Sequence, residues 1–216
     1  MSDLTTTDTP AADATVSPEP RARRGQARGD TRARLLAAAE ALFVEKGFHA
    51  TRPQDISRAA GVGHGTFYLH FKDKQDCFLA FAEKAAETLE AFVEEGVSEN
   101  APPYESIRGT MERTYQFAEA NPGLMAAALT DISVIDGGEG GAVLMQRWGE
   151  QWAERLAGWQ AEGRLRPGVD TAFIGFAIPG MMRQAGLRAV RDDTEPGAAV
   201  DALMEFLSVG LGLTDD

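Results

Sequence analysis

The segment from residue 51 to residue 71, TRPQDISRAAGVGHGTFYLHF, constrains the fold of this 216-residue chain more than any other. Its pattern predicts a short helix beginning near Thr51 to Pro53, because a proline in the first turn loses no hydrogen bond. Gly61 ends that helix, and another short helix is expected from about His64 to Phe71. Two short helices joined by a glycine turn form a helix-turn-helix, whose second helix enters the major groove of DNA.

Longer helices are predicted on both sides of this motif. The preceding one is expected from near Asp30 or Thr31 to Gly47, because apolar residues recur there at helical spacing. In the following one, Asp73 is a good N-cap with Asp76 three residues later, as in a capping box, and the apolar face continues to about residue 96. The apolar residues expected to pack together are Ile56, Ala60, Val62, Phe67 and Phe71 of the motif against Leu36, Leu42 and Phe43.

The remainder of the chain also has helical periodicity, and no stretch alternates with period two over a useful length. Helices are expected from about residue 107 to Pro122, over 124–132, over 144–159 before Gly163, over 170–190 and over 196–212. Glycines at 137, 138, 140 and 141 indicate a loop. The fold class predicted is all-α, with about nine helices and no sheet.

The charge of the chain is unevenly distributed, although the net charge is -12. Residues 1–20 have four acidic and no basic residues, residues 21–80 have 11 basic and 6 acidic residues, and residues 81–216 have 10 and 23. This distribution suggests an anion-binding module attached to another domain, although chance alone could give an excess of this size. One cysteine excludes an intramolecular disulfide, and no apolar run approaches a membrane span or a secretory signal, so we expect a cytoplasmic protein.

Residues 1–28 are expected to form a disordered arm with a basic end. Residues 1–20 contain no aromatic side chain and cannot bury enough surface to offset chain entropy, whereas residues 21–28 read RARRGQAR. Such an arm either lies along phosphates or in a minor groove, or stays a solvated tail. The domains predicted after it are a DNA-binding domain over 29–89, with its motif at 52–71, and a C-terminal domain over 90–216.

Two residues near the motif favour a nucleic-acid partner. Leu69 is expected to point away from the side of its helix that Phe67 and Phe71 bury, and an outward leucine suits a thymine methyl group, although isolated exposed leucines are common. Lys74 lies in the first turn of its helix, where the helix dipole disfavours a cation. An anion such as phosphate would explain it, and so would a solvated lysine offset by Asp73 and Asp76.

Residues 29–89 resemble the DNA-binding domain of TetR-family transcriptional repressors. The run G-V-x-x-G-T-F-Y-x-H-F-x-x-K is specific, and it covers under a third of the chain. The residues that carry the resemblance are Ala39, Leu42, Phe43, Gly47, Thr51, Ile56, Ala60, Gly61, Val62, Gly65, Thr66, Tyr68, His70, Phe71 and Lys74. Two departures are Gly63, where the family often has a serine cap, and Pro53, where an aliphatic residue is usual.

The resemblance also implies a role for each residue of the motif. Thr51 and Arg52 would touch phosphates at the start of the first short helix. The residues implied to face base edges or the groove wall are His64, Gly65, Thr66 and Leu69. The residues implied to hold the DNA backbone are Tyr68, His70 and Lys74.

The C-terminal domain contains most of the aromatic and methionine side chains, which build ligand cavities between the helices of bundles. In TetR-like proteins this domain holds a small effector, and few candidate positions are charged, so an apolar or amphipathic effector is favoured. The candidate effector-binding residues are Phe92, Tyr115, Met125, Trp148, Trp152, Phe173 and Phe176. Each could instead be an ordinary core residue. A polar end of the effector could be anchored by Arg108, Arg113, Arg183 or Gln184.

Residues 172–182, AFIGFAIPGMM, are apolar on every side, so we expect this helix to cover its own domain and a partner subunit. The last helix is also strongly apolar, with Val200, Leu203, Met204, Leu207 and Leu211. Together they predict a homodimer, whose twofold symmetry would match a palindromic operator. The sequence thus favours a repressor released from double-stranded operator DNA by its effector. Alternatives are an activator, a regulator that answers a protein, and a helical enzyme fused to the motif. No cofactor, metal site or catalytic residue is predicted.

Overall fold

The computed structural model of the chain describes residues 20–98, 100–130, 140–192 and 194–213. Over these residues the fold is all-α and contains no strand. The nine helices described are α1 (Pro20–Ala50), α2 (Pro53–Ala59), α3 (His64–Phe67), α4 (Lys74–Glu94), α5 (Pro103–Ala120), α6 (Pro122–Thr130), α7 (Gly140–Ala161), α8 (Thr171–Asp192) and α9 (Pro196–Leu211). The expected fold class is therefore confirmed.

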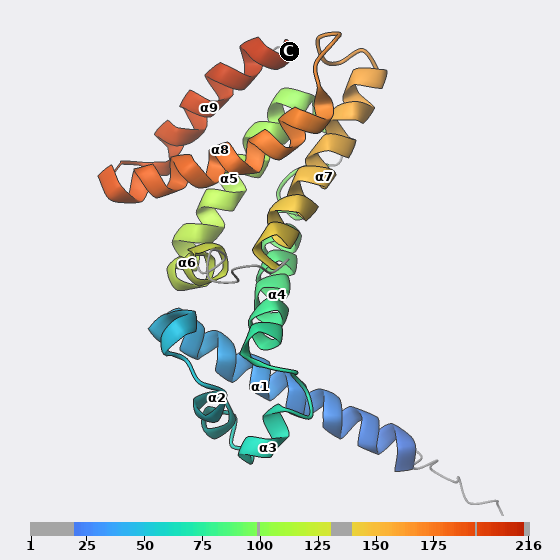
Figure 1. Cartoon of the computed structure of the whole chain (residues 1–216). Coiled ribbons are helices and arrows are strands. Elements are labelled where there is room, and N and C mark those ends of the chain that lie inside the picture. Colours follow the sequence, from blue (N-terminus) through green and yellow to red (C-terminus); the bar gives the residue numbers. More distant parts are fainter. Residues whose placement is uncertain (1–19, 99, 131–139, 193, 214–216) are drawn as a thin grey trace, which may run out of the picture.

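The helices form two bodies joined by the long helix α4 (Figure 1). Helices α1 to α3 and the start of α4 form the lower body, and α5 to α9 pack with the end of α4 in the upper one. The N-terminus of α4 is capped as its sequence predicts, because the Asp73 side chain accepts from the backbone N–H of Asp76 at 2.9 Å. The Asp76 side chain accepts in turn from the N–H of Lys72 at 2.8 Å.

The core of the lower body contains the apolar residues that the sequence pairs. Leu36, Phe43, Ile56, Ala60, Phe67 and Phe71 are buried in one cluster with Phe78 and Phe81, and Leu42 and Val62 pack against it. Helix α6 also contacts this body: Ala127 is buried in the same cluster, and Leu124 packs against it. The upper body therefore touches the lower one through α6 as well as through α4.

Several expected element boundaries were wrong. Helix α1 begins at Pro20 rather than near Asp30, so residues 20–28 of the expected disordered arm are helical, while residues 1–19 lie outside the described part of the chain. Helix α3 ends at Phe67, and a turn continues to His70. Gly140 and Gly141 begin α7 instead of lying in a loop, whereas Gly137 and Gly138 fall outside the described residues. Gly47 does interrupt α1, with a φ of 76° that favours glycine.

The close crossing of α7 and α8 dominates the upper body. A Cβ atom on Gly175 of α8 would lie 2.5 Å from the backbone nitrogen of Ala153 in α7, so only glycine permits this approach. The core beside the crossing contains Leu156 of α7 and Ile178 of α8. Residues of α5 and α9 also belong to it, namely Ile107, Met111, Met204 and Leu207. Helices α8 and α9 therefore share one core with α7, which fixes the side that each presents outward.

Candidate DNA-binding interface

The outward side of α3 and of the turn after it is the exposed surface of the helix-turn-helix. Phe67 and Phe71 are buried beneath it, whereas 52% of Tyr68 and 67% of Leu69 is exposed. His64 and Gly65 are exposed and Thr66 is half-buried. The predicted outward orientation of Leu69 is thus confirmed. The imidazole of His64 meets the ring of Tyr68 edge-on at 5.4 Å between centroids, so these two aromatic groups form one surface.

Two arginines of α1 lie against the end of this surface. The Arg28 guanidinium donates to the backbone carbonyl of Leu69 at 3.1 Å, and the Arg32 guanidinium lies 5.0 Å from the centre of the Phe71 ring. Burial, together with the charges of Arg28 and Arg32, lowers the pKa of His70 below its ordinary value of 6.5. His70 is therefore neutral at pH 7, and two fixed cations adjoin it.

Thr51 does not have the role that the resemblance implied. Only 1% of the residue is exposed, and its hydroxyl lies 2.8 Å from the carbonyl oxygen of Gly47 and 3.2 Å from that of Leu42. The implied side-chain contact with a phosphate is therefore wrong, because this hydroxyl ties the start of α2 to the end of α1. Arg52, the next residue, is exposed.

Lys74 is also engaged within the protein. Its ammonium donates to the carbonyl oxygen of Phe48 at 2.7 Å and lies 4.0 Å from the centre of the Phe48 ring. The carbonyl of His49 lies 3.5 Å away. Because carbonyl groups at the end of α1 already stabilise this cation, its place in the first turn of α4 does not require a phosphate.

Sequence reasoning missed three arginines of α1 that position the motif: Arg28, Arg32 and Arg34. Arg34 donates to the carbonyl oxygens of Ala60 and Gly61, and so holds the turn between α2 and α3. The helical spacing of Arg28 and Arg32 could have revealed them, but only once residues 20–30 were taken as helix. A small hollow lined by Gln54, Ser57, Arg58, Val62 and His64 adds polar groups of α2 beside α3.

The seven candidate effector residues do not surround one cavity. Phe92, Met125 and Trp148 contact one cluster together with Leu89 and Phe117, which come from α4 and α5. Tyr115 and Trp152 belong to the other core of the upper body, where burial raises the pKa of Tyr115 to about 12 and its hydroxyl donates to the carbonyl of Met182 at 2.8 Å. Phe173 and Phe176 are exposed on α8, so expecting them to line a pocket within one subunit was wrong.

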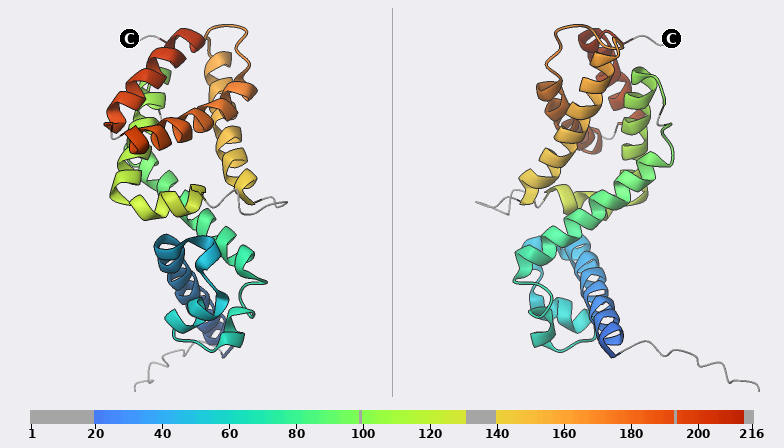
Figure 2. Two further views of the ribbon diagram at one scale, coloured as in Figure 1. Left: turned by 60° about the vertical axis from the view of Figure 1, so that its left-hand side comes forward. Right: turned by 90° about the vertical axis from the view of Figure 1, so that its right-hand side faces the viewer.

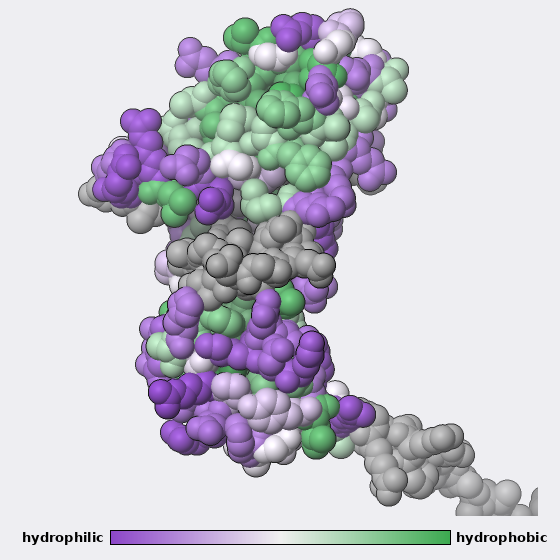
Figure 3. All heavy atoms as spheres, in the orientation of Figure 1, coloured by the Kyte–Doolittle hydropathy of each residue, from purple (hydrophilic) through white to green (hydrophobic). Residues whose placement is uncertain are grey.

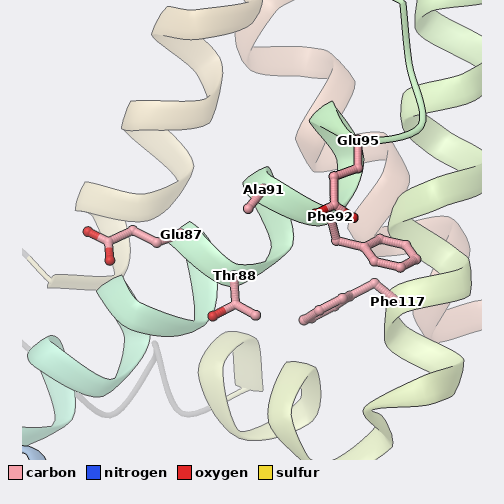
Figure 4. Close-up of a pocket in the computed structure, with 6 residues that line it drawn as sticks. All are labelled: Glu87, Thr88, Ala91, Phe92, Glu95 and Phe117. Atoms are coloured by element: carbon pink, nitrogen blue, oxygen red, sulfur yellow. The ribbon is translucent and has the colours of Figure 1, made fainter.

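An open groove of about 490 Å³ lies beside the first of these clusters. Figure 4 shows it along α4, with the rings of Phe92 and Phe117 next to one another and Glu87 pointing away from them. Its lining residues are Glu87, Thr88, Ala91, Phe92, Glu95 and Phe117. Of the seven candidates, only Phe92 lines it, and the sequence offered no signal for the rest.

Glu90 joins α4 to α7 next to this groove. Its carboxylate pairs with Arg147 and accepts from the indole Nε1 of Trp148 at 3.1 Å. The candidate anchors are also committed within the protein: Arg113 donates to the Phe92 carbonyl, and its guanidinium lies 3.8 Å from that ring centre. Arg108 pairs with Glu112 and Asp201. Arg183 and Gln184 are exposed on α8.

Helices α8 and α9 present an apolar outer face (Figure 3). We call this the α8–α9 face, and its exposed residues are Phe173, Phe176, Leu187, Phe206 and Val209. Leu207, in contrast, is 1% exposed and belongs to the core of its own subunit. Val200, Met204 and Leu211 are buried in the same core. The expectation that α8 is apolar on two sides is confirmed, but the outward residues of α9 are not those that the sequence singled out.

Among the described residues, no group of three or more histidine, cysteine, aspartate or glutamate side chains could hold a metal ion. None of the described helices is long and apolar enough to span a membrane.

The DNA-binding motif also identifies the relatives of the chain. A family model described as "Bacterial regulatory proteins, tetR family" matches residues 35–81, from the middle of α1 into α4. The helix-turn-helix domain of the chain is that of the TetR family. The match includes α2, α3 and the core beneath them.

Individual relatives of the chain are also named as regulators. The HTH-type transcriptional activator FasR of Mycolicibacterium smegmatis is 30% identical over 99 residues, which are 45% of each chain. The fatty acid metabolism regulator protein of Bacillus subtilis is 35% identical over 74 residues, 34% of this chain and 38% of its own. The chain spans about half the length of three of the curated relatives that it matches, from 38% to 54%. Its match to the HTH-type transcriptional regulator EthR of Mycolicibacterium smegmatis, at 24% identity, spans 88% of that protein.

A solved structure extends the likeness of the fold beyond the motif. The transcriptional regulator FadR from Bacillus subtilis, in complex with stearoyl-CoA, superposes with a TM-score of 0.68 over 82% of this chain and 98% of its own. The two sequences are 21% identical over this superposition. At that identity the comparison establishes a shared fold, upper body included.

Proposed function

We propose that this chain is a homodimeric, sequence-specific DNA-binding regulator whose affinity for its operator is lowered by a small apolar or amphipathic effector. The observation that carries the proposal is the exposed surface of α3, where Tyr68 and Leu69 lie outward above the buried Phe67 and Phe71. Base edges in the major groove are read by such outward side chains of a recognition helix.

Within this surface, reading and positioning fall to different residues. His64, Gly65, Thr66 and Leu69 would face the bases, while Arg52, Tyr68 and His70 would hold phosphates on either side. Thr51 and Lys74 would act from inside the domain, because their polar groups bind the carbonyls that end α1. Contacts to phosphates set the position and contacts to bases set the sequence preference.

A twofold dimer would place two such surfaces on one DNA. The α8–α9 face supports it, because a contiguous apolar surface rimmed by polar residues marks an interaction site. Burying Phe173, Phe206 and Val209 against the same face of a second copy would remove these side chains from water. The two copies of α3 would then read half-sites about 34 Å apart, or a multiple of that distance.

The effector site that we propose lies among α4, α5, α6 and α7, around Phe92, Phe117, Met125 and Trp148. The groove beside Phe92 would be its entrance. Relatives named for fatty acid metabolism, and a structural neighbour described with stearoyl-CoA, favour a fatty acyl compound as the class of effector. Because α4 and α6 also contact the lower body, a ligand among these helices would change the placement of α3.

Selection of bound fragments from random double-stranded DNA tests this function. We expect enrichment of an inverted repeat whose half-sites are spaced by one or two helical turns. Adding stearoyl-CoA to the bound complex should then release the DNA. Recovery of random sequences, with no repeat enriched, would contradict the proposed function, whereas enrichment without release by any acyl compound would contradict only the effector class.

A further inference from the structure

Helix α6 lies at the junction of the two bodies, next to the C-terminal end of α1 (Figure 2). Its residues contact both sides of that junction. Ala127 is buried in the core of the lower body, whereas Met125 is buried in the cluster that includes Phe92 and Phe117. Leu124 packs against both of these clusters. Helix α6 therefore connects the proposed effector site to the lower body within one turn.

Helices α6 and α1 approach one another closely at Gly123 and Val44. A Cβ atom on Gly123 would overlap Cγ1 of Val44 and lie 3.4 Å from its Cβ. Valine is branched at Cβ and strongly prefers one rotamer in a helix, so this side chain does not readily turn away. The two helices consequently touch here without spare room.

Val44 is held firmly to the rest of the lower body. Its neighbour Phe43 is 1% exposed, and the centre of its ring lies 5.2 Å from that of Phe78 in α4. Glu40, one turn earlier in α1, pairs with Lys84 of α4 at 2.8 Å. A force on Val44 therefore moves α1 together with the start of α4 and the helix-turn-helix that packs on them.

From these contacts we infer that Gly123 and Val44 form the point at which effector binding moves the DNA-binding body. A ligand inserted among Phe92, Phe117 and Met125 would press α6 toward α1. Because no room is left at Gly123, α1 would move with it. In a dimer, the same movement in both subunits changes the spacing of the two copies of α3. This inference rests on the proposed function and names the contact that regulates it.

A methyl group at position 123 should reproduce the effect of the effector in its absence. Gly123→Ala presses on Val44 from the side of α6, so we expect operator affinity to fall by about 5- to 150-fold, the usual range of coupling between sites. The affinity for stearoyl-CoA should rise, because the movement that the ligand requires has already been made. Loss of folding would instead lower both affinities.

A second substitution in the same chain tests whether the methyl group acts through Val44. Val44→Ala removes the Cγ1 atom that the methyl group would overlap, so Gly123→Ala/Val44→Ala should bind the operator like the wild type. Val44→Ala alone should bind the operator normally and be released less by stearoyl-CoA, because the added room absorbs part of the movement of α6. The matched control is Gly158→Ala in α7, where no neighbouring atom lies within 4 Å of the added Cβ.

Equilibrium binding of the selected operator and of stearoyl-CoA to these variants decides the inference. An operator affinity of Gly123→Ala equal to that of Gly158→Ala would overturn it, and so would a loss that Val44→Ala does not restore. A wild type that selects no operator contradicts the proposed function itself. If stearoyl-CoA does not bind the wild type, the loss in Gly123→Ala and its restoration by Val44→Ala still test the contact, because both are measured with DNA alone.

Discussion

Neighbouring residues of α9 should respond in opposite ways to a negative charge if the α8–α9 face joins two subunits. Phe206 is 65% exposed and Leu207 is 1% exposed. Phe206→Glu should therefore leave the monomer folded and prevent its association. Leu207→Glu should unfold the monomer, because it places an unpaired carboxylate in the subunit core.

The size of the first effect follows from the exposure of Phe206. Burying a whole phenylalanine side chain contributes about 1.5–3 kcal/mol, so burying its exposed part contributes about 1–2 kcal/mol per subunit. A twofold interface contains the substitution twice, so the dimer loses about 2–4 kcal/mol of association free energy. Desolvation of the new carboxylate adds to this loss. At 1.4 kcal/mol per tenfold, the dimer dissociation constant should rise at least about 30- to 700-fold.

Sedimentation velocity over a dilution series measures this constant, and circular dichroism reports whether each variant is folded. Leu69→Glu is the matched control, since Leu69 is equally exposed but lies on the DNA-binding body. It should sediment as the wild-type dimer. A Phe206→Glu protein with the dissociation constant of the wild type, or a wild type that is monomeric at micromolar concentration, would refute the interface.

Three further predictions concern the motif and the effector site. Thr51→Val should lower the free energy of unfolding by about 1–3 kcal/mol in urea titrations, because the Thr51 hydroxyl donates to the carbonyls of Gly47 and Leu42. It should leave the salt slope of DNA binding unchanged, and a slope reduced by one unit would disprove the buried role. Because the pKa of His70 is lowered in the folded protein, its neutral form contributes stability that is present above pH 6.5 and lost as the pH falls below that value. The melting temperature of His70→Gln should therefore fall less than that of the wild type between pH 8 and pH 5. An acyl compound that binds should change the fluorescence emission of Trp148, whose indole donates to Glu90. DNA should weaken binding of the compound by the same factor, typically 5–150-fold, by which the compound weakens DNA binding. Unequal factors would contradict coupling between the two sites.

Local patterns in the sequence were enough to predict the lower body. The spacing of Phe67 and Phe71, the glycine at 61 and the capping pair Asp73 and Asp76 each depend on residues close in the chain, and all appear as expected. The start of α1 was misjudged because two glycines and a run of arginines have low helix propensity or repel one another. Residues 20–30 extend a helix that Leu35 already anchors in the core, so this segment does not have to form the costly first helical turn.

The upper body could be predicted only as a set of helices. Whether Phe206 or Leu207 faces outward depends on how α9 lies against α5 and α8, and helical periodicity leaves the direction of the apolar side open when most residues are apolar. The position of Lys74 shows the same limit. Its binding to the carbonyl of Phe48 joins residues 26 apart in the chain, and no local rule anticipates that contact.

The central claim is that the outward side chains of α3 read DNA bases, and repeating the random-DNA selection with α3 variants tests it most directly. Leu69→Ala and Thr66→Ala should each relax the preference at one or two positions of each half-site and leave the others unchanged. Thr88→Ala, an exposed threonine on α4, should select the wild-type operator. Position preferences of Leu69→Ala and Thr66→Ala identical to those of the wild type would contradict the account.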